Sequence, residues 1–574
     1  MSKFKESILK EIENQKSVYL SDNSRIVADY NNELETIKAY NGRQLLELLQ
    51  NADDELSEEV LIDIDAQKKV LEIANRGNDC KPFSAGGIKS LMVSNFSPKT
   101  TKKYIGNKGL GFRSIVNWSN TITINSQNLD IIFSKSIAEK LYDEICDEQK
   151  QKKIAEQRNL PIDVKPIAFL SVPELSENIQ NKWTTVIKIE CKNAFLSDIK
   201  NQIVNIQDEI LLFVNNINKI IISIDGHIKT IERLKDKKTI YVNEKLWTIH
   251  KKRGELKPEL WDKENEEENY ELKIAIQENF DKKNNFLYSY FPTKIDIDFP
   301  FIIHGTFDLN SSRNDLNDNP KNKFVLKRLV ELIIQTAKEL TKEEVSYKAL
   351  ELLTHNNKNT TLKNLEFYEN VDASIDELLV FPCVDNTYRK KSEVIYISDA
   401  FSELIIKTEN QSLLPHLLIP NNNTVDIKKF DLKISIPTKS LNEISANIKN
   451  LDDRADLIFQ FHETFKHETR LVFLVDKNNE LVGLEDEVYT PISRNFNINI
   501  PDYVNIKFIN NELFKKLLIK FDIKSNEKAR DLQRVLKDIT NIQSYEPAQI
   551  LQKIITSTNK EIKKENINVI RTIT

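Results

Sequence analysis

The sequence predicts an α+β fold with more than one domain. Apolar residues recur three and four positions apart in 3–15 and 26–39, which indicates amphipathic helices. Residues 59–65 and 70–74 have the pattern of paired strands, and an Asp-Gly turn predicts a hairpin over 219–230. The chain of 574 residues is long enough for three or four domains.

The composition is that of a soluble globular protein, with 40% hydrophobic and 29% charged residues. No run of about 18 apolar residues occurs, so we expect no membrane span, and the first residues lack the apolar core of a signal peptide. Four scattered cysteines without metal-binding spacing favour free thiols in a reducing cytoplasm. A net charge of −5 provides no global attraction to nucleic acid.

Glycine is concentrated in one part of the chain. Of the 11 glycines, six lie between Arg43 and Arg113, namely Gly77, Gly86, Gly87, Gly106, Gly109 and Gly111. Glycine permits positive φ and close approach of the backbone to a ligand. The window from Arg43 to Arg113 therefore predicts a ligand site built largely from backbone.

A helical pattern over 43–55 opens this window. Glu47 and Asn51 are four residues apart, about one helical turn, so their side chains share a face, and Asp54 follows on that face. A carboxylate beside an amide oxygen suits a base that activates water next to Mg²⁺, because Mg²⁺ takes hard oxygen ligands and few of them from protein. The pattern predicts Asn51 as the metal ligand.

The sequence Gly106-x-x-Gly109-x-Gly111 closes the window and precedes an apolar helical run. Glycines before a helix let backbone N–H groups approach phosphate, and the helix N-terminus adds partial positive charge. Lys108 adds a point charge for the phosphates. Residues 94–108 are either a lid over the nucleotide or a solvated loop.

The order and spacing of these motifs resemble the GHKL ATPases, a family that includes the ninety-kilodalton heat-shock chaperones, gyrase B, MutL, MORC and histidine kinases. Glu-Leu-Leu-Gln-Asn-Ala-Asp-Asp is similar to their N box, and the sacsin-like branch is most similar in Gln-Asn-Ala-Asp-Asp and Gly-x-Lys-Gly-Leu-Gly-Phe-Arg-Ser. The resemblance implies an N-terminal Bergerat-type α/β sandwich with helices on a mixed, mostly antiparallel sheet. It also implies ATP and Mg²⁺ as cofactors and a homodimer.

The resemblance assigns roles to individual residues. Glu47 would accept the proton of the attacking water, and Asn51 would hold Mg²⁺. The phosphates would lie against Gly106, Lys108, Gly109, Gly111 and Phe112, and the nucleoside against Asp54, Asn75, Gly77 and Thr185. Three positions depart from the family: Asn75 replaces an Asp that binds adenine, Asp79 stands where a second Gly would follow, and Thr184 replaces the Gly before Thr185. The first departure puts base selectivity in doubt, although an Asn carbonyl still accepts a hydrogen bond.

A second informative segment is 286–316. Its Ser312-Arg313 resembles the turn in the chaperone middle domain whose Arg reaches the γ-phosphate, and guanidinium suits that role. Arg313 is therefore the second expected catalytic residue. The alternative is an Arg that pairs with Asp315 or Asp318 in a surface turn. We expect His304 to be a packed strand residue.

We expect three domains: an ATP-binding domain at 1–216, a middle domain at 217–355 and, after a polar linker at 356–361, a C-terminal α+β region at 362–574, which contains two faintly related modules. Within the first domain, residues 136–158 predict one long charged helix and residues 167–172 a strand. The N-terminal helices would either cross to a second subunit or pack on their own domain.

A basic run occupies 229–253, and it indicates either a solvated face or a contact with nucleic acid. His462 and His467 are five apart, so they diverge on a helix and do not predict a zinc site.

Three functions remain open. The first is slow Mg²⁺-dependent ATP hydrolysis that drives a conformational clamp; the second is an ATP-sensing protein or chaperone-like scaffold without turnover. The third, a histidine kinase module, lacks an upstream phosphoacceptor, since the first histidine is His227. The sacsin-like resemblance further implies a microbial antiviral defence or restriction role with a nuclease or helicase partner.

Overall fold

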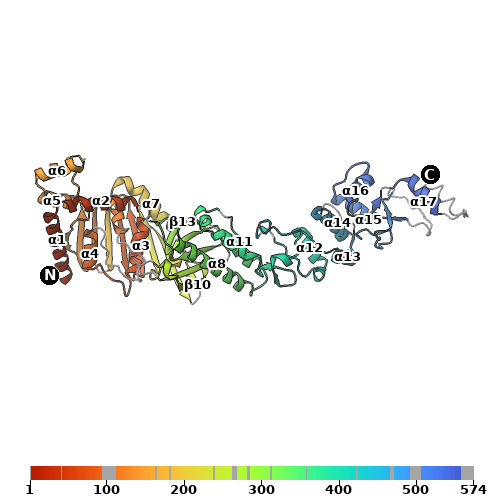
Figure 1. Cartoon of the computed structure of the whole chain (residues 1–574), viewed down its shortest axis with the longest axis horizontal. Coiled ribbons are helices and arrows are strands. Elements are labelled where there is room, and N and C mark those ends of the chain that lie inside the picture. Colours follow the sequence, from red (N-terminus) through yellow and green to blue (C-terminus); the bar gives the residue numbers. More distant parts are fainter. Residues whose placement is uncertain are drawn as a thin grey trace. The chain divides into compact units, whose positions relative to one another are not determined.

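The computed structural model describes residues 2–39, 42–93, 111–158, 160–161, 164–179, 182–236, 239–261, 268–278, 280, 285–310, 313–356, 358–421, 424–465, 471–491, 506–543 and 545–557. The chain forms two compact units, which consist of Met1–Ile334 with His355–Val371 and of Gln335–Thr354 with Asp372–Thr574. Both contain helices and strands (Figure 1), which confirms the α+β class.

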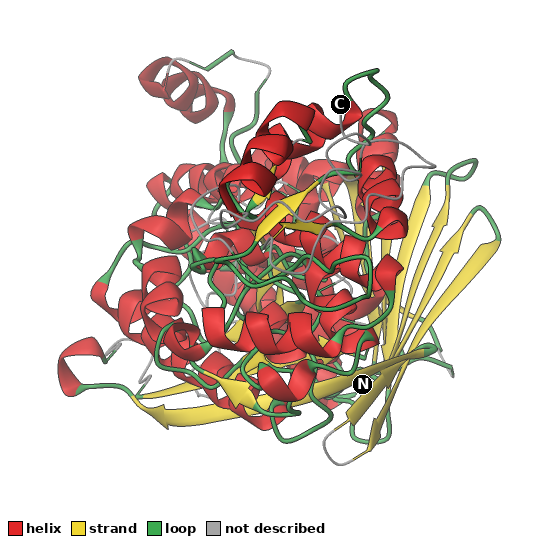
Figure 2. Cartoon of the chain, turned by 90° about the vertical axis from the view of Figure 1, so that its right-hand side faces the viewer, coloured by secondary structure: helices red, strands yellow, loops and turns green. Residues whose placement is uncertain are grey.

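The first unit is built on a single sheet of the order β13-β12-β14-β11-β10-β9-β8-β7-β1-β2-β6-β3-β4-β5. The strands are β1 (Glu59–Asp65), β2 (Val70–Arg76), β3 (Ser119–Ser126), β4 (Leu129–Ser134), β5 (Glu174–Glu177), β6 (Thr185–Cys191), β7 (Lys219–Ile224), β8 (His227–Asp236), β9 (Thr239–Val242), β10 (Lys245–Glu255), β11 (Asn269–Gln277), β12 (Phe286–Ser289), β13 (Phe291–Asp296) and β14 (Phe301–Gly305). Most neighbours are antiparallel, and the pairs β1·β7 and β12·β14 are parallel. The strands, yellow in Figure 2, fan out with the usual twist.

The helices of the first unit are α1 (Lys3–Ser21), α2 (Ser24–Ala39), α3 (Gln44–Asp54), α4 (Ala85–Met92), the 3₁₀ segment η1 (Gly111–Trp118), α5 (Lys135–Ile145), α6 (Glu148–Arg158), η2 (Asn193–Phe195), α7 (Leu196–Val204), η3 (Asp208–Leu212), η4 (Pro258–Leu260), α8 (Pro320–Leu340), α10 (Thr360–Asn364) and α11 (Phe367–Ile375). Helices α8 and α11 each continue from this unit into the second.

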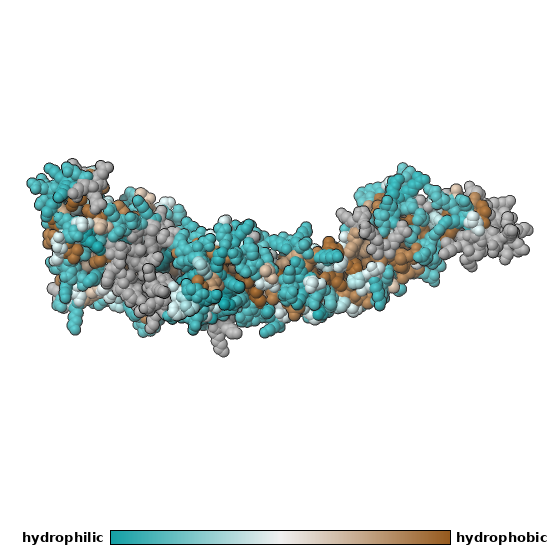
Figure 3. Space-filling model, in the orientation of Figure 1, coloured by the Kyte–Doolittle hydropathy of each residue, from teal (hydrophilic) through white to brown (hydrophobic). Residues whose placement is uncertain are grey.

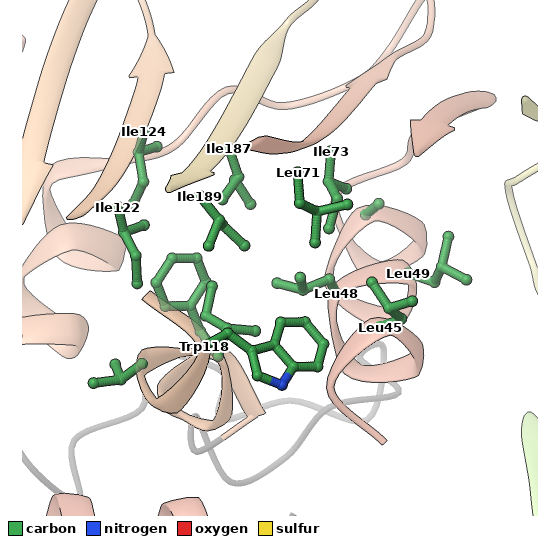
Figure 4. Packing of buried hydrophobic residues seen from close by; sticks show 14 of the residues in the cluster. Leu45, Leu48, Leu49, Leu71, Ile73, Trp118, Ile122, Ile124, Ile187 and Ile189 are labelled. Carbon is green, nitrogen blue, oxygen red and sulfur yellow. The ribbon is translucent and has the colours of Figure 1, made fainter. Parts of the chain in front are cut away.

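The core of the first unit lies between one face of the sheet and these helices. Strand β1 alternates buried and half-buried residues, and its buried side consists of Val60, Ile62 and Ile64. Figure 4 shows Leu48 of α3 directed toward apolar side chains of β2 and β6, with Trp118 beside it, and Leu45 and Leu49 of the same helix belong to the same core. Each fully buried side chain of this kind contributes about 1.5–3 kcal/mol, so packing fixes α3 against the sheet.

The N-terminal helices pack on their own domain. Helix α1 contacts α2 and α4, and α2 contacts η1. Ile8, Tyr19 and Ile26 are fully buried in the same core as α3. Of the two alternatives drawn from the sequence, the structure therefore shows the packing within one chain.

The predicted boundary at 216/217 lies within continuous structure. The hairpin with Asp225-Gly226 at its turn forms as expected, with positive φ at both residues. Its first strand, β7, extends the sheet by parallel pairing with β1, and its second strand, β8, pairs with β7 over one half and with β9 over the other. The sheet thus passes without interruption from the expected ATP-binding domain into the expected middle domain.

Two local predictions are wrong. The helix expected over 136–158 is broken between α5 and α6, because buried Cys146 is extended and the Asp147 carboxylate accepts the backbone N–H of Lys150 at the start of α6. The strand expected over 167–172 is an irregular buried segment. Its backbone does not need a strand partner, since the N–H groups of Phe169 and Leu170 donate to the Glu33 carboxylate.

The second unit is an α+β assembly of short elements. Besides the C-terminal part of α8, it contains α9 (Lys348–Leu352), β15 (Phe381–Pro382), β16 (Tyr388–Arg389), α12 (Asp399–Lys407), α13 (Thr438–Asn447), α14 (Leu451–Phe465), β17 (Glu487–Tyr489), β18 (Ile506–Phe508), α15 (Asn511–Lys520), α16 (Lys528–Leu536), β19 (Ile542–Gln543) and α17 (Pro547–Ser557). Arg454, 1% exposed, donates to backbone carbonyls of Ser445, Ile448 and Phe473 and so joins α13, α14 and the following loop.

The surface in view is largely hydrophilic (Figure 3), in keeping with the mean hydropathy of −0.45. Within the described ranges, no helix combines the length and the apolar character that a bilayer crossing demands.

Candidate functional site

Helix α3 carries a buried polar stripe opposite its apolar side. Glu47, Gln50, Asn51 and Asp54 are spaced three and four residues apart, so they lie on one face of the helix. Glu47 is 5% exposed, Gln50 3% and Asp54 6%. Buried charged and amide groups are rare unless they are paired or functional, which marks this stripe as the candidate site.

Arg313 reaches the stripe from a turn 263 residues later in the chain than Gln50. Its Nη1 donates to Oε1 of Gln50 at 2.7 Å and lies 3.5 Å from Oε1 of Glu47. The backbone of Arg313 has φ of 55°, a left-handed conformation that costs a non-glycine residue about 1–2 kcal/mol. The partners of Arg313 are therefore on α3 rather than Asp315 or Asp318 of its own turn.

Gln50 also carries a donor that is not used. Its Nε2 is buried, and no acceptor among the described residues bonds to it. A buried donor without a partner costs about 1–3 kcal/mol. The donor belongs to the same stripe as Glu47, so a ligand oxygen that enters the stripe would satisfy it.

Asn75 and Thr185 lie on the face of the sheet against which α3 packs. They are directly paired across β2 and β6, and the alternation of the strands places them on the same face as Ile73 and Ile187, which α3 covers. Nδ2 of Asn75 donates to Oγ of Ser57 at 2.8 Å and to Sγ of Cys80 at 3.3 Å. The hydroxyl of Thr185 is 3.4 Å from that of Ser126.

The expectation that glycines build the site stays a prediction, since three of the six glycines have other settings in the structure and two lie outside the described residues. A Cβ on Gly77 would lie 2.8 Å from the backbone nitrogen of Glu58, so Gly77 is needed for packing of the chain on itself. Gly86 and Gly87 belong to helix α4 and have no contact that demands glycine. Gly106, Lys108 and Gly109 lie outside the described residues.

Phe112, at the end of the predicted phosphate-binding motif, is buried in the core of the first unit. Gly111 begins η1, and Phe112 is 4% exposed and packs edge-on against Phe83 with ring centroids 6.4 Å apart. The side chain of Phe112 is thus a core residue beside the motif.

Arg113 belongs to a buried charge network. Its Nη2 donates to the carbonyl of Leu91 at 2.7 Å, and its Nη1 is 3.5 Å from the Glu33 carboxylate on α2. Burial raises the pKa of Glu33 and lowers that of Arg113, and each charge favours the other against this effect. The network ties the N-terminal helices to the residue that follows the glycine motif.

Sequence reasoning missed several residues that hold α3 in place. The carboxylate of Asp53, fully buried, accepts the backbone N–H groups of Asn215, Asn216 and Ile217. At the other end of α3, Nη1 of Arg43 donates to the carbonyl of Pro292 at 2.8 Å. Gln50 was detectable from its spacing of three from Glu47, whereas these longer contacts have no local signal.

An open pocket of about 580 Å³ lies near the end of β2 but does not contain Glu47 or Asn51. Arg76, Trp183 and Thr184 line it, and the guanidinium of Arg76 lies 4.8 Å from the centroid of the Trp183 ring. The pocket includes Gly77 and is therefore a neighbour of the candidate site, on the opposite side of the strand from Asn75.

The metal-binding capacity of the site is modest. Asn51 is half-buried on the stripe and contributes one amide oxygen next to the Glu47 carboxylate. Among the residues that the structure describes, no cluster of three or more His, Cys, Asp or Glu has the geometry of a metal cage. One amide oxygen, with water and phosphate for the remaining positions, fits Mg²⁺. His462 lies on α14, whereas His467 falls outside the described part of the chain.

No family model matches the chain, and no curated protein matches it.

Proposed function

We propose that the protein binds ATP on the polar stripe of α3 and hydrolyses it slowly with the help of Mg²⁺. The contact of Arg313 with Glu47 and Gln50 carries this proposal. It joins a carboxylate that can accept a proton and a guanidinium that can bind phosphate, and it does so at a residue with a strained backbone.

In this mechanism Glu47 accepts a proton from water as the water oxygen attacks the γ-phosphorus. The bond from phosphorus to the ADP oxygen breaks, ADP leaves with the electron pair, and the proton passes from Glu47 to solvent. Such base catalysis contributes about 10²–10⁴-fold. Arg313 would neutralise part of the charge on the phosphoryl oxygens, and the unused N–H of Gln50 would donate a hydrogen bond to one of them.

Asn51 would hold Mg²⁺, which neutralises phosphate charge when it is bound. The nucleoside would lie toward the end of α3, against Asn75 and Thr185. Because Nδ2 of Asn75 donates to Ser57, its carbonyl oxygen is the atom that would accept the amino group of adenine.

A second function is favoured by the same contact. The Arg313 guanidinium lies 3.5 Å from Oε1 of Glu47 and would compete with an attacking water for that oxygen. If the 3.5 Å contact between Glu47 and Arg313 persists with nucleotide bound, the protein senses ATP without turning it over, and ATP binding would set the geometry of a clamp or scaffold.

Turnover of radiolabelled ATP by the wild type and by Glu47→Gln tests the proposal, together with nucleotide affinity from calorimetry. We expect both proteins to bind ATP with Mg²⁺ and only the wild type to release phosphate. Binding by both with release by neither would establish the sensor. Absence of binding in both would refute the site itself.

The role in antiviral defence or restriction, the nuclease or helicase partner and the homodimer stay predictions. Pull-down of the partners encoded by neighbouring genes, with and without ATP, tests the first two, and light scattering with a non-hydrolysable analogue tests the third.

A further inference from the structure

A positively charged surface lies on strands β8, β10 and β11 of the first unit. We define the basic face as Lys235, Lys251, Arg253 and Lys273. Lys251 is directly opposite Lys273 across β10 and β11, and the charges of both act on Lys235. Glu271 bonds to Lys273 and Arg253, and it is the one carboxylate within 4.0 Å of the basic face among the described residues.

The structure separates this face from the rest of the basic run at 229–253. Lys229, Lys245 and Lys252 each pair with a carboxylate of their own, from Asp208, Glu209 and Glu331, whereas the basic face has only Glu271 among the described residues. Arg233 is 3% exposed and donates to the carbonyls of Leu211 and Val214, so its role is structural. Lys273 comes from a different part of the sequence and lies beside Lys251 through strand pairing; its side chain is 13% exposed and bonds to Glu271 at the edge of the face.

This arrangement is costly for the fold. Like charges directly opposite each other in an antiparallel pair are destabilising, and Lys251 with Lys273 form such a pair. Partial burial of the amine, followed by the charge of Arg233, lowers the pKa of Lys235 to about 8. Sequences keep locally unfavourable arrangements mainly where a function needs them.

We propose that the basic face binds the phosphate backbone of double-stranded nucleic acid without reading its sequence. Lys251 and Arg253 are two residues apart on one strand, so they project on the same side and present a row of cations. Backbone contacts of this type supply affinity that does not depend on sequence.

The neighbouring residues argue against two other ligands, single-stranded nucleic acid and a membrane surface. On the same side of the strands the cations are flanked by Ile249, Glu255 and Ala275. None of these is aromatic, and His304, which pairs with Lys273 from β14, is fully buried, so the described part of the face lacks the exposed stacking platforms typical of single-strand binding. Ile249 and Ala275 are buried, so they provide no apolar anchor for a membrane surface.

The inference does not depend on ATP binding, because none of the four cations belongs to the α3 stripe. Its test is fluorescence anisotropy of a labelled 30-base-pair DNA duplex of mixed sequence with the full chain, at 50–200 mM KCl. Three to four contacts predict a slope of about −3 to −4 for log affinity against log salt. Lys251→Gln with Lys273→Gln should lower the magnitude of the slope by about 1 to 2, since Lys273 is mostly buried, and weaken binding about tenfold or more.

The matched control is Lys229→Gln with Lys245→Gln, which removes the same charge from ion-paired lysines and should leave affinity within about twofold. Glu271→Gln should strengthen binding, because it removes the counter-charge of the face. The thermal midpoint of the Lys251/Lys273 variant should equal or exceed that of the wild type, which separates lost binding from lost folding.

Three results would overturn the proposal. The first is no duplex binding at 50 mM KCl, and the second is equal weakening by the control pair. The third is equally tight binding of polyglutamate or of phosphatidylserine vesicles, which would assign the face to an acidic protein or a membrane instead.

Discussion

Arg313 illustrates how one residue brings distant parts of the chain together. Its side chain is 18% exposed and bonds to Gln50, and its backbone adopts a left-handed conformation. The backbone strain at Arg313 and the stabilisation from its hydrogen bond to Gln50 are of similar size and opposite sign, each about 1 kcal/mol. Stability and function at this position should therefore respond differently to mutation.

Arg313→Gly tests this separation. Glycine relieves the backbone strain while it removes the guanidinium, so we expect the free energy of unfolding to change by less than about 1 kcal/mol. ATP turnover should fall by about 10²-fold or more, since an arginine that contacts transferring phosphate contributes about 10³–10⁵-fold. Urea unfolding and phosphate release measure the two effects.

Arg328→Gln is the control, because Arg328 pairs with Glu331 on the surface of α8, away from the stripe. A strongly destabilised Arg313→Gly protein would show that the arginine is structural.

His304 is a second residue whose state follows from its surroundings. It is fully buried, its Nδ1 accepts the backbone N–H of Tyr290 at 3.0 Å, and its ring stacks on Phe213. Burial, and then the charge of Lys273, holds the pKa of His304 well below its usual value. This confirms the expectation of a packed strand residue.

The unfolded chain protonates His304 near pH 6.5, whereas the folded chain keeps it neutral. The unfolded state then binds more protons, so stability falls as the pH drops below about 6.5, by up to about 1.4 kcal/mol per unit. Urea unfolding of the first unit at pH 7, 6 and 5 should show a shallower pH dependence in His304→Gln than in the wild type. His227→Gln, at an exposed position, should leave the dependence unchanged.

Gly77, which follows β2, and Gly86, in α4, differ in the space that a side chain would have. Gly77 follows β2, where a Cβ would lie 2.8 Å from the backbone nitrogen of Glu58, while the nearest atom to a Cβ at Gly86 in α4 is a side-chain oxygen at 3.8 Å. We expect Gly77→Ala to lower the free energy of unfolding by about 1–3 kcal/mol through overpacking. Gly86→Ala should raise it by up to about 1 kcal/mol through helix propensity. Equal thermal midpoints for the two variants would contradict this interpretation.

At the level of elements, the sequence predicted correctly those strands and turns whose formation depends on residues close by in the chain. Strands β1 and β2 and the hairpin at Asp225-Gly226 form as the sequence indicates, because alternation and turn chemistry are encoded within a few residues. The break between α5 and α6 and the irregular segment at 167–172 depend on partners far away, such as Glu33. The apolar periodicity of those segments carries no information about such distant partners.

The same division applies to the candidate site. Glu47 and Asn51 share a face because helix geometry places them there. The approach of Arg313 was expected from a family resemblance, since no local pattern links residues 263 positions apart. The anchoring role of Asp53 was missed because its carboxylate bonds to backbone groups, which every residue carries.

The whole chain consists of two units that are interleaved in sequence. Residues 355–371 return to the first unit, where the ring of fully buried Phe299 lies beside those of His355, Phe367 and Tyr368. Helix α10 begins at Thr360, within the segment expected to be a polar linker. A cut at this predicted linker would therefore remove part of the first core.

A fragment of residues 1–371 should be more stable than a fragment of residues 1–355. The longer fragment keeps several buried side chains of the returning segment, namely Leu362, Leu365, Phe367 and Tyr368, each worth about 1.5–3 kcal/mol. We expect the shorter fragment to be insoluble or to melt more than about 10 °C lower. Equal melting midpoints of the two fragments in scanning calorimetry would instead support the predicted linker at 356–361.

Strand β8 has a mechanical consequence. It is one unbroken strand whose hydrogen bonds reach β7 on one side and β9 on the other, so the two halves of the sheet have no loop between them on which to swing. We expect a displacement at β10 to deform the whole sheet elastically and to reach β1 through β8. In this respect the sheet of the first unit is one elastic body rather than two rigid parts joined by a hinge.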